Sequence, residues 1–159
     1  MRELNISNHG REPPSSRKDL INWVKERLKR YNIRLRKKLS QIILVDPRTL
    51  HFMARKLSEF IASEGSITIL EIGAGVGNLT QFVSYENRNA LIIAVEIDYR
   101  FAPILQEIKA AYSNVDIIIG DALGLLKTMR GIDIVIGNIP YHITSDILLA
   151  LAKSDIPFA

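Results

Sequence analysis

Short runs of Ile, Val and Leu alternate with amphipathic segments along most of the chain, and this alternation limits the possible fold more than any other feature. The strand-like runs are residues 67–73, 91–97, 115–121 and 133–138. The helical patterns between and after them are residues 78–85, 100–112, 122–129 and 145–153. Continuous apolar strands separated by helices predict a parallel sheet flanked by helices on both faces. We therefore expect an α/β domain over residues 39–159.

The first 38 residues differ in charge from the rest of the chain. They hold 12 Lys and Arg against 4 Asp and Glu, whereas the remaining residues hold 9 against 13. Residues 1–16 are polar and without period, which predicts a flexible tail. Residues 17–38 predict a basic N-terminal helix or arm that begins at Arg17. This charge favours a polyanionic partner, with nucleic acid as the leading candidate, although a solvated surface helix has the same pattern.

Phosphate contacts from this arm would come from its Lys and Arg side chains. The candidates are Lys25, Arg27, Lys29, Arg30, Arg34, Arg36, Lys37 and Lys38. Trp23 on the same helix could stack on RNA or pack against the domain. Further along, Asp46 and Pro47 supply an N-cap and a first-turn proline for a second helix that ends near Gly65.

Composition removes several classes of function. The chain has no cysteine, which excludes disulfides, thiolate metal sites and a cysteine nucleophile. Its three histidines show no metal-ligand spacing, so we expect no metal. The longest apolar run, residues 90–95, is far shorter than a membrane helix, and the start of the chain lacks the apolar region of a secretory signal. We expect a cytoplasmic protein with no membrane partner, and the sequence does not require an oligomer.

The first and second strands end in residues suited to a nucleoside-type ligand. Gly73, Gly75 and Gly77 follow the first strand, and glycines there let the backbone approach a ligand or let helix and sheet pack closely. Their spacing departs from the dinucleotide fingerprint G-x-G-x-x-G. Glu96 ends the second strand, where a carboxylate can accept hydrogen bonds from both ribose hydroxyls. The less favoured alternative is that Glu96 is an ordinary polar strand end.

The third strand ends at Asp121, which has two compatible roles. Its carboxylate could accept a hydrogen bond from an adenine amino group. It could also cap the helix that begins at Ala122.

The fourth strand runs into the sequence NIPY, residues 138–141. An aromatic amine is a poor nucleophile because its lone pair is delocalised into the ring. Carbonyls of the Asn138 side chain and the Ile139 main chain could each accept one amine hydrogen and direct the lone pair at an electrophile. Pro140 would stiffen this turn, and Tyr141 would offer a face on which an extruded base stacks. Alternatively, Tyr141 packs into the core and the segment is an ordinary loop.

Taken in order, the segments LSQIILVD, EIGAGVGNLT, VEID, GDAL and GNIPYHITSDILLAL resemble the ribosomal RNA adenine dimethyltransferases. The resemblance runs from about Arg27 to the last residue. It implies a Rossmann-like class I methyltransferase fold, with S-adenosylmethionine as cofactor and small-subunit ribosomal RNA, or a pre-ribosomal particle, as partner. It also implies dimethylation of the N6 amine of adenine.

The resemblance assigns roles to individual residues. It implies a contact of Gly73 with the methionine side of the cofactor, beside Gly75 in the same turn. It further implies ribose recognition by Glu96 and adenine recognition by Asp121. Asn138 and Tyr141 would position the target base, and Asn138 would also contact the cofactor. The segment LSQIILVD, residues 39–46, precedes the second helix and is called the lead-in segment. It would add the cofactor contacts Gln41, Ile42 and Leu44.

The chain departs from the family pattern in two places. The family usually has Asn or His where this chain has Ile42, whose side chain has no hydrogen-bonding group. The family also continues into three further strands and a helical C-terminal domain that contributes to rRNA binding. We therefore expect an incomplete fold of about four strand-helix units, in which the fourth strand is an exposed edge.

Other functions fit parts of the pattern. One alternative is a non-catalytic RNA-binding or ribosome-assembly factor that retains the fold, which Ile42 favours and the intact residues 138–141 oppose. Another is a methyltransferase that acts on DNA adenine or a protein amide, because similar loops serve planar amino groups in general. A nicotinamide-dependent enzyme is disfavoured by the glycine spacing and by the loop after the fourth strand.

Overall fold

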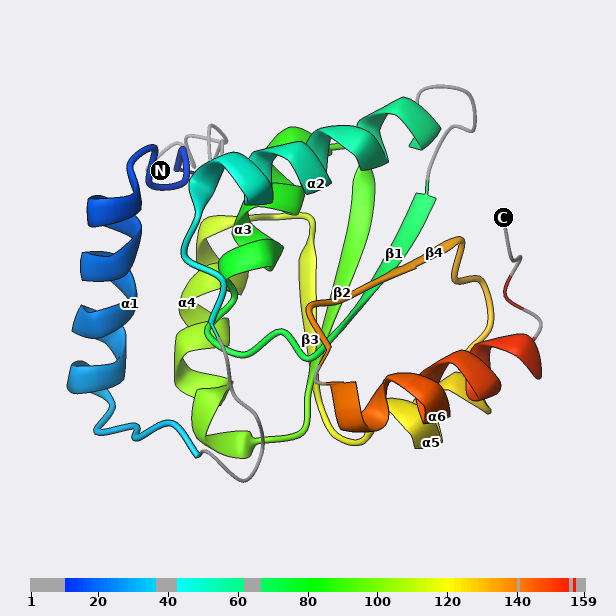
Figure 1. Cartoon of the computed structure of the whole chain (residues 1–159). Coiled ribbons are helices and arrows are strands. Elements are labelled where there is room, and N and C mark those ends of the chain that lie inside the picture. Colours follow the sequence, from blue (N-terminus) through cyan, green and yellow to red (C-terminus); the bar gives the residue numbers. More distant parts are fainter. Residues whose placement is uncertain (1–10, 37–42, 62–66, 140, 155, 157–159) are drawn as a thin grey trace, which may run out of the picture.

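The structure, a computed structural model, describes residues 11–36, 43–61, 67–139, 141–154 and 156, with the backbone alone at residues 141 and 142. The described strands form one parallel sheet in the order β3-β2-β1-β4 (Figure 1). Their bounds are β1 (Ile67–Ile72), β2 (Ala90–Glu96), β3 (Val115–Ile119) and β4 (Ile134–Ile136). This is the predicted α/β architecture.

The Ile-rich sequence of β1 suits its central place in the sheet. Ile69 is fully buried and pairs with Ile92 of β2 on one side and with Ile134 of β4 on the other. A strand enclosed on both sides and both faces favours apolar side chains on both faces, which explains the absence of regular polar alternation. β4 pairs only with β1 among the described strands, so it is the edge that the sequence predicts.

Helices cover both faces of the sheet. Helices α1–α4 lie on one side of the sheet and α5 and α6 on the other (Figure 1). Ile67 and Ile69 belong to a core formed with side chains of α1–α4, whereas Leu70 and Ile72 pack with side chains of α5 and α6. This alternation is the period of two that a strand imposes. The bounds are α1 (Arg17–Arg30), α2 (Pro47–Ile61), α3 (Asn78–Glu86), α4 (Ala102–Ala111), α5 (Ala122–Leu126) and α6 (Tyr141–Ala152).

The N-terminal region is more integrated than the sequence predicts. Residues 11–16, the described part of the expected tail, contact the domain: Pro13 is buried, and the Tyr112 hydroxyl donates to the Arg11 carbonyl at 2.6 Å. The basic helix is α1, and its Leu20 and Val24 are buried in the core. The division between an arm at residues 17–38 and a domain at residues 39–159 therefore does not hold for α1, because this helix supplies part of the domain core.

Helix boundaries follow local chemistry. α2 begins at Pro47 as predicted, and the Thr49 hydroxyl donates to the Asp46 carboxylate at 2.8 Å. α6 begins at Tyr141, earlier than the predicted Ser145. The prediction missed the first turn of this helix because that turn lacks the apolar spacing that marks the rest. α5 ends at Leu126, short of the predicted residue 129. No helix within the described ranges is long and apolar enough to span a membrane.

Candidate cofactor and adenine site

The predicted site residues lie where the four parallel strands end. Ligands of open parallel sheets bind outside the carboxyl ends of the strands, at the point where the strand order reverses. Here the chain moves outward from β1 through β2 to β3 and then returns to place β4 on the other side of β1. The turn at residues 73–77 follows β1, and Asn138 lies two residues beyond β4.

Three glycines in the turn after β1 have left-handed torsions. The φ angles are +74° at Gly73, +55° at Gly75 and +76° at Gly77. A Cβ atom at Gly77 would approach Ile108 of α4 to 2.9 Å, so that glycine serves packing. A Cβ at Gly73 or Gly75 would meet no atom within 4 Å. These two glycines therefore border open space, which suits a ligand contact.

Glu96 ties the glycine turn to the end of β2. Its carboxylate accepts the N–H of Gly75 at 2.7 Å and the N–H of Asp98 at 2.8 Å. Burial raises the pKa of Glu96, and the hydrogen bonds from Asp98 and Gly75 act in the opposite direction. Each carboxylate oxygen can accept more than one hydrogen bond, so both retain capacity for donors such as ribose hydroxyls.

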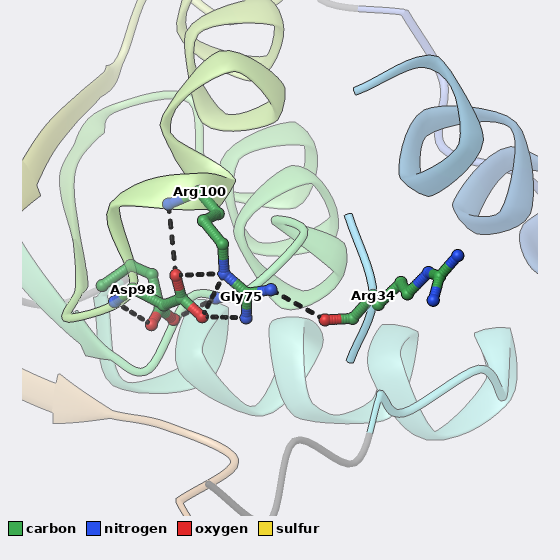
Figure 2. A network of polar contacts seen from close by, with 5 residues as sticks. Arg34, Gly75, Asp98 and Arg100 are labelled. Atoms are coloured by element: carbon green, nitrogen blue, oxygen red, sulfur yellow. Dashed lines mark hydrogen bonds and ion pairs between the residues drawn. The ribbon is translucent and has the colours of Figure 1, made fainter. Parts of the chain in front are cut away.

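Arg100, which the sequence did not single out, stabilises the loop after β2. Arg100 forms an ion pair with the buried Asp98, and its guanidinium also donates to the main-chain carbonyl of Arg34 at 2.9 Å. Figure 2 shows Arg100 between these two partners, with Gly75 beside Asp98. The ion pair fixes the loop after β2, and the second contact connects that loop to the segment that follows α1.

Asp121 performs the capping role that the sequence allows. It is the N-cap of α5, and its carboxylate accepts the N–H of Leu123 at 3.0 Å. The residue is exposed, so a second donor can reach the carboxylate. Adenine recognition by Asp121 remains a prediction.

A cavity of about 50 Å³ unites four of the predicted residues. They are Leu44, Gly73, Gly75 and Asn138. Glu96 and Asp121 are not among the described residues that line this cavity, and Glu96 contacts the glycine turn through the Gly75 N–H. Gly137 explains how Asn138 comes so close, because a Cβ there would lie 2.5 Å from the Ile72 carbonyl oxygen.

The cavity also contains two polar residues that the sequence analysis did not assign. Asn78 is the first residue of α3, and Glu71 lies in β1 with its side chain fully enclosed. Burial raises the pKa of Glu71 to about 7, and the hydrogen bond from the Thr80 hydroxyl, at 2.6 Å, partly opposes that shift. A glutamate inside an otherwise apolar strand was the available sequence signal for this site.

The rest of the target loop is described in part. The Asn138 side chain is exposed at the rim of the cavity, while Ile139 packs into the core next to α5 and α6. This leaves the main chain of Ile139 for the predicted amine contact. Pro140, Gln41 and Ile42 lie outside the described residues, as does the side chain of Tyr141.

The predicted RNA-binding residues fall into two groups. Arg27 and Arg30 form ion pairs with Glu107 of α4, at 3.1 and 2.9 Å, and the Tyr31 hydroxyl donates to the same carboxylate. Arg27 also lies over the Trp23 ring at 3.9 Å, and Trp23 packs against the core. These contacts are internal to the domain.

The remaining cations of this set are exposed where the structure describes them, as Arg30 is. Lys25, Lys29, Arg34 and Arg36 are exposed, whereas Lys37 and Lys38 lie outside the described residues. The described part of the chain contains no group of three His, Asp or Glu side chains that could hold a metal ion.

Comparisons with known proteins identify the family of the chain. The sequence profile of the family described as ribosomal RNA adenine dimethylase matches residues 32–157. The small-subunit rRNA methyltransferase A of Lactococcus lactis is 34% identical over 140 residues, which are 83% of this chain and 46% of that protein. A Streptococcus equi protein of the same name is 35% identical over 139 residues, with 82% and 46% covered. This chain thus spans about half the length of these curated relatives.

Solved structures show the same likeness. A dimethyladenosine transferase from Plasmodium falciparum is 27% identical with a TM-score of 0.53, covering 67% of this chain and 38% of that one. The 23S rRNA methyltransferase ErmE is 28% identical with a TM-score of 0.54, covering 69% and 42%. An SAH-bound methyltransferase from Podospora anserina, at 18% identity and a TM-score of 0.66, covers 94% and 61% and shows the Rossmann-like methyltransferase fold. This chain belongs to the ribosomal RNA adenine dimethylase family.

Proposed function

We propose that this chain binds S-adenosylmethionine and methylates the N6 amine of adenine in small-subunit ribosomal RNA, up to the dimethyl product. Family membership and the names of the Lactococcus and Streptococcus relatives support the substrate. The observation that carries the proposal is the meeting of Gly73, Gly75 and Asn138 at one cavity, with Glu96 bound to the back of the same turn.

The described residues fit the cofactor. Gly73 and Gly75 border open space, Glu96 has acceptor capacity for the ribose, and Asp121 is exposed at the end of β3. Ile97, next to Glu96, is 65% exposed and offers an apolar surface for a base. Leu44, with Gln41 and Ile42 outside the described residues, would complete the methionine side. When bound, S-adenosylmethionine supplies an electrophilic methyl group.

The chain's own contribution to chemistry is positioning of the amine. The Asn138 side-chain carbonyl and the Ile139 main-chain carbonyl would each accept one hydrogen of the adenine amine, which directs the nitrogen lone pair into the cavity. Pro140 would hold this turn, and the Tyr141 ring would stack on the extruded base. Exposed Lys25, Lys29, Arg34 and Arg36 would contact phosphates of the RNA or pre-ribosomal particle, in the cytoplasm.

Calorimetric titration with S-adenosylmethionine tests the cofactor half of this proposal. Two variants at Asp121 make it specific, because Ser retains an N-cap but is too short to reach a base, whereas Ala removes both roles. We expect micromolar binding by the wild type and weak binding by both variants, with stability lost only in Asp121→Ala. A folded wild-type chain that does not bind would contradict the proposal and favour an RNA-binding factor without transferase activity.

A further inference from the structure

Asn78 has one amide atom whose role the fold explains and one whose role it does not. The residue begins α3 directly after Gly77 and is 5% exposed. Its Nδ2 donates to the main-chain carbonyl of Leu44 at 2.7 Å. Because a carbonyl oxygen can accept only from the NH₂ group, this contact fixes the orientation of the amide. It also joins the lead-in segment to the glycine turn.

The opposite atom, Asn78 Oδ1, is buried and accepts no hydrogen bond from any residue that the structure describes. Asn78 lines the cavity together with Gly73, Glu71 and Asn138. Buried carbonyl groups without a donor are rare, because desolvation is then uncompensated. Asn78 therefore brings to this cavity a buried acceptor without a donor, which an N–H or O–H group of a ligand would satisfy.

Charge narrows the kind of donor. None of the described residues that line the cavity is cationic, and this lining includes the Glu71 carboxyl group. A cationic donor forms a stronger hydrogen bond to such an acceptor than a neutral donor does, and no cation in the described lining would repel it. The volume of about 50 Å³ has room for a few heavy atoms, since one water needs about 10 to 15 Å³. An ammonium group on a short chain fits these conditions, and a nucleoside does not.

The sequence at position 42 gives a reason for Asn78 to contact the cofactor. Position 42 holds Ile, where the resemblance implies a polar side chain that contacts the cofactor. We propose that Asn78 Oδ1 binds the α-ammonium group at the methionine end of the cofactor and replaces the polar contact missing at position 42. This inference rests on the proposed function, because it assigns one residue within the same cofactor site.

The test compares two ligands and three forms of the 159-residue chain. S-adenosylhomocysteine carries the amino-acid end, whereas 5′-methylthioadenosine lacks it. Asn78→Ala removes the Oδ1 acceptor and also the tether to Leu44. Asn78→Asp removes the tether but retains an acceptor, and an acidic residue suits the first turn of a helix. Circular dichroism of each variant verifies folding.

We expect Asn78→Ala to weaken S-adenosylhomocysteine binding by about tenfold to a hundredfold, as for a lost hydrogen bond to a charged group. Binding of 5′-methylthioadenosine should stay within about twofold, and Asn78→Asp should recover most of the lost affinity. Equal weakening of both ligands would overturn the inference, because Asn78 would then act only through the turn. Unchanged binding of both ligands would overturn it as well.

Two results separate this inference from the proposed function. If the wild type binds neither ligand, the cofactor site itself is wrong. If it binds both and Asn78→Ala does not discriminate between them, only the role of Asn78 is wrong. Should the variants fail to fold, the wild type is titrated with deaminated S-adenosylhomocysteine, which retains the carboxylate. Weaker binding than for S-adenosylhomocysteine, by about tenfold or more, supports an ammonium site, and equal binding rejects it.

Discussion

The Glu96 carboxylate accepts the main-chain N–H of Gly75 at 2.7 Å, so the end of β2 holds the glycine turn that follows β1. The Asp98 N–H binds the other carboxylate oxygen at 2.8 Å. A neutral amide at this position would have one oxygen for two donors and would place an NH₂ group against the other N–H. The two strand ends are thus joined by a group that requires both of its oxygens.

Glu96→Gln should therefore weaken both the fold and the cofactor site. We expect a loss of about 1 to 3 kcal/mol in the free energy of unfolding and at least about a tenfold loss of cofactor affinity. Urea denaturation and calorimetry measure the two effects. Glu59→Gln, which removes one carboxylate of an exposed ion pair with Lys56, is the matched control and should change neither. Wild-type behaviour of Glu96→Gln would contradict the role given to this carboxylate.

The buried Glu71 should make stability depend on pH. Its pKa rises from 4.5 in a model peptide to about 7 in the folded chain, because burial disfavours the charged form and the Thr80 hydrogen bond offsets only part of this. The folded state therefore holds a proton that the unfolded state releases, so stability falls as the pH rises from 4.5 to 7, by about 3 kcal/mol from this group.

Glu71→Gln isolates that contribution, since Gln is neutral and can still accept from Thr80. Urea denaturation at a series of pH values should show a shallower decline for the variant across the interval from 4.5 to 7. Parallel curves for the variant and the wild type would mean that Glu71 is ionised in the folded chain throughout.

Two glycines separate backbone strain from ligand contact. Gly73 and Gly131 have φ angles of +74° and +71°, and a Cβ at either would meet no atom within 4 Å. Gly73 lines the cavity, whereas Gly131 precedes β4 at the opposite end of that strand from Asn138. Alanine at either position should cost about 1 to 2 kcal/mol of stability through left-handed strain.

Only Gly73→Ala should also impair binding, because its methyl group would occupy the open space beside the turn. Calorimetry with S-adenosylhomocysteine compares the two variants at matched stability. The site assignment fails if Gly131→Ala and Gly73→Ala bind equally well.

The two groups of cations should respond differently to substitution. Replacing exposed Lys25 and Lys29 together with Ala should lower RNA affinity and reduce the salt dependence of binding, by about 0.7 to 0.9 in log–log slope for each lost phosphate contact. The unfolding midpoint should not change. Arg27→Ala should instead lower the free energy of unfolding by about 1 to 2 kcal/mol, since it removes contacts to Glu107 and Trp23.

Filter binding across a salt series and urea denaturation of the same preparations measure these effects. An unchanged salt slope in the Lys25 and Lys29 double variant would show that RNA approaches another surface.

The fold was predictable because its signals are local. Each strand is rich in Ile, Val and Leu, and Glu96 and Asn138 lie at or just beyond the ends of strands whose carboxyl ends must share one edge of the sheet. Capping by Asp121 was also predictable, because it needs only the next few residues.

The features that the sequence did not predict depend on contacts between residues far apart in the chain. Glu107 binds Arg30 across 77 positions, and Arg100 binds the Arg34 carbonyl across 66, which no local pattern reveals. Both contacts turn residues of the supposed basic arm into supports of the domain. The unpartnered Oδ1 of Asn78 could not be predicted either. Its orientation is fixed by the hydrogen bond from Nδ2 to the Leu44 carbonyl, which joins two distant segments.

The most direct test of the central claim is transfer of a labelled methyl group from S-adenosylmethionine to unmodified small-subunit rRNA, followed by nucleoside analysis. We predict label in N6-methylated and N6,N6-dimethylated adenosine with the wild type, and a loss of at least about a hundredfold with Asn138→Ala, as for removal of a positioning hydrogen bond in the transition state. Cofactor binding by a folded chain without labelled adenosine, or label that persists in Asn138→Ala, would contradict the account.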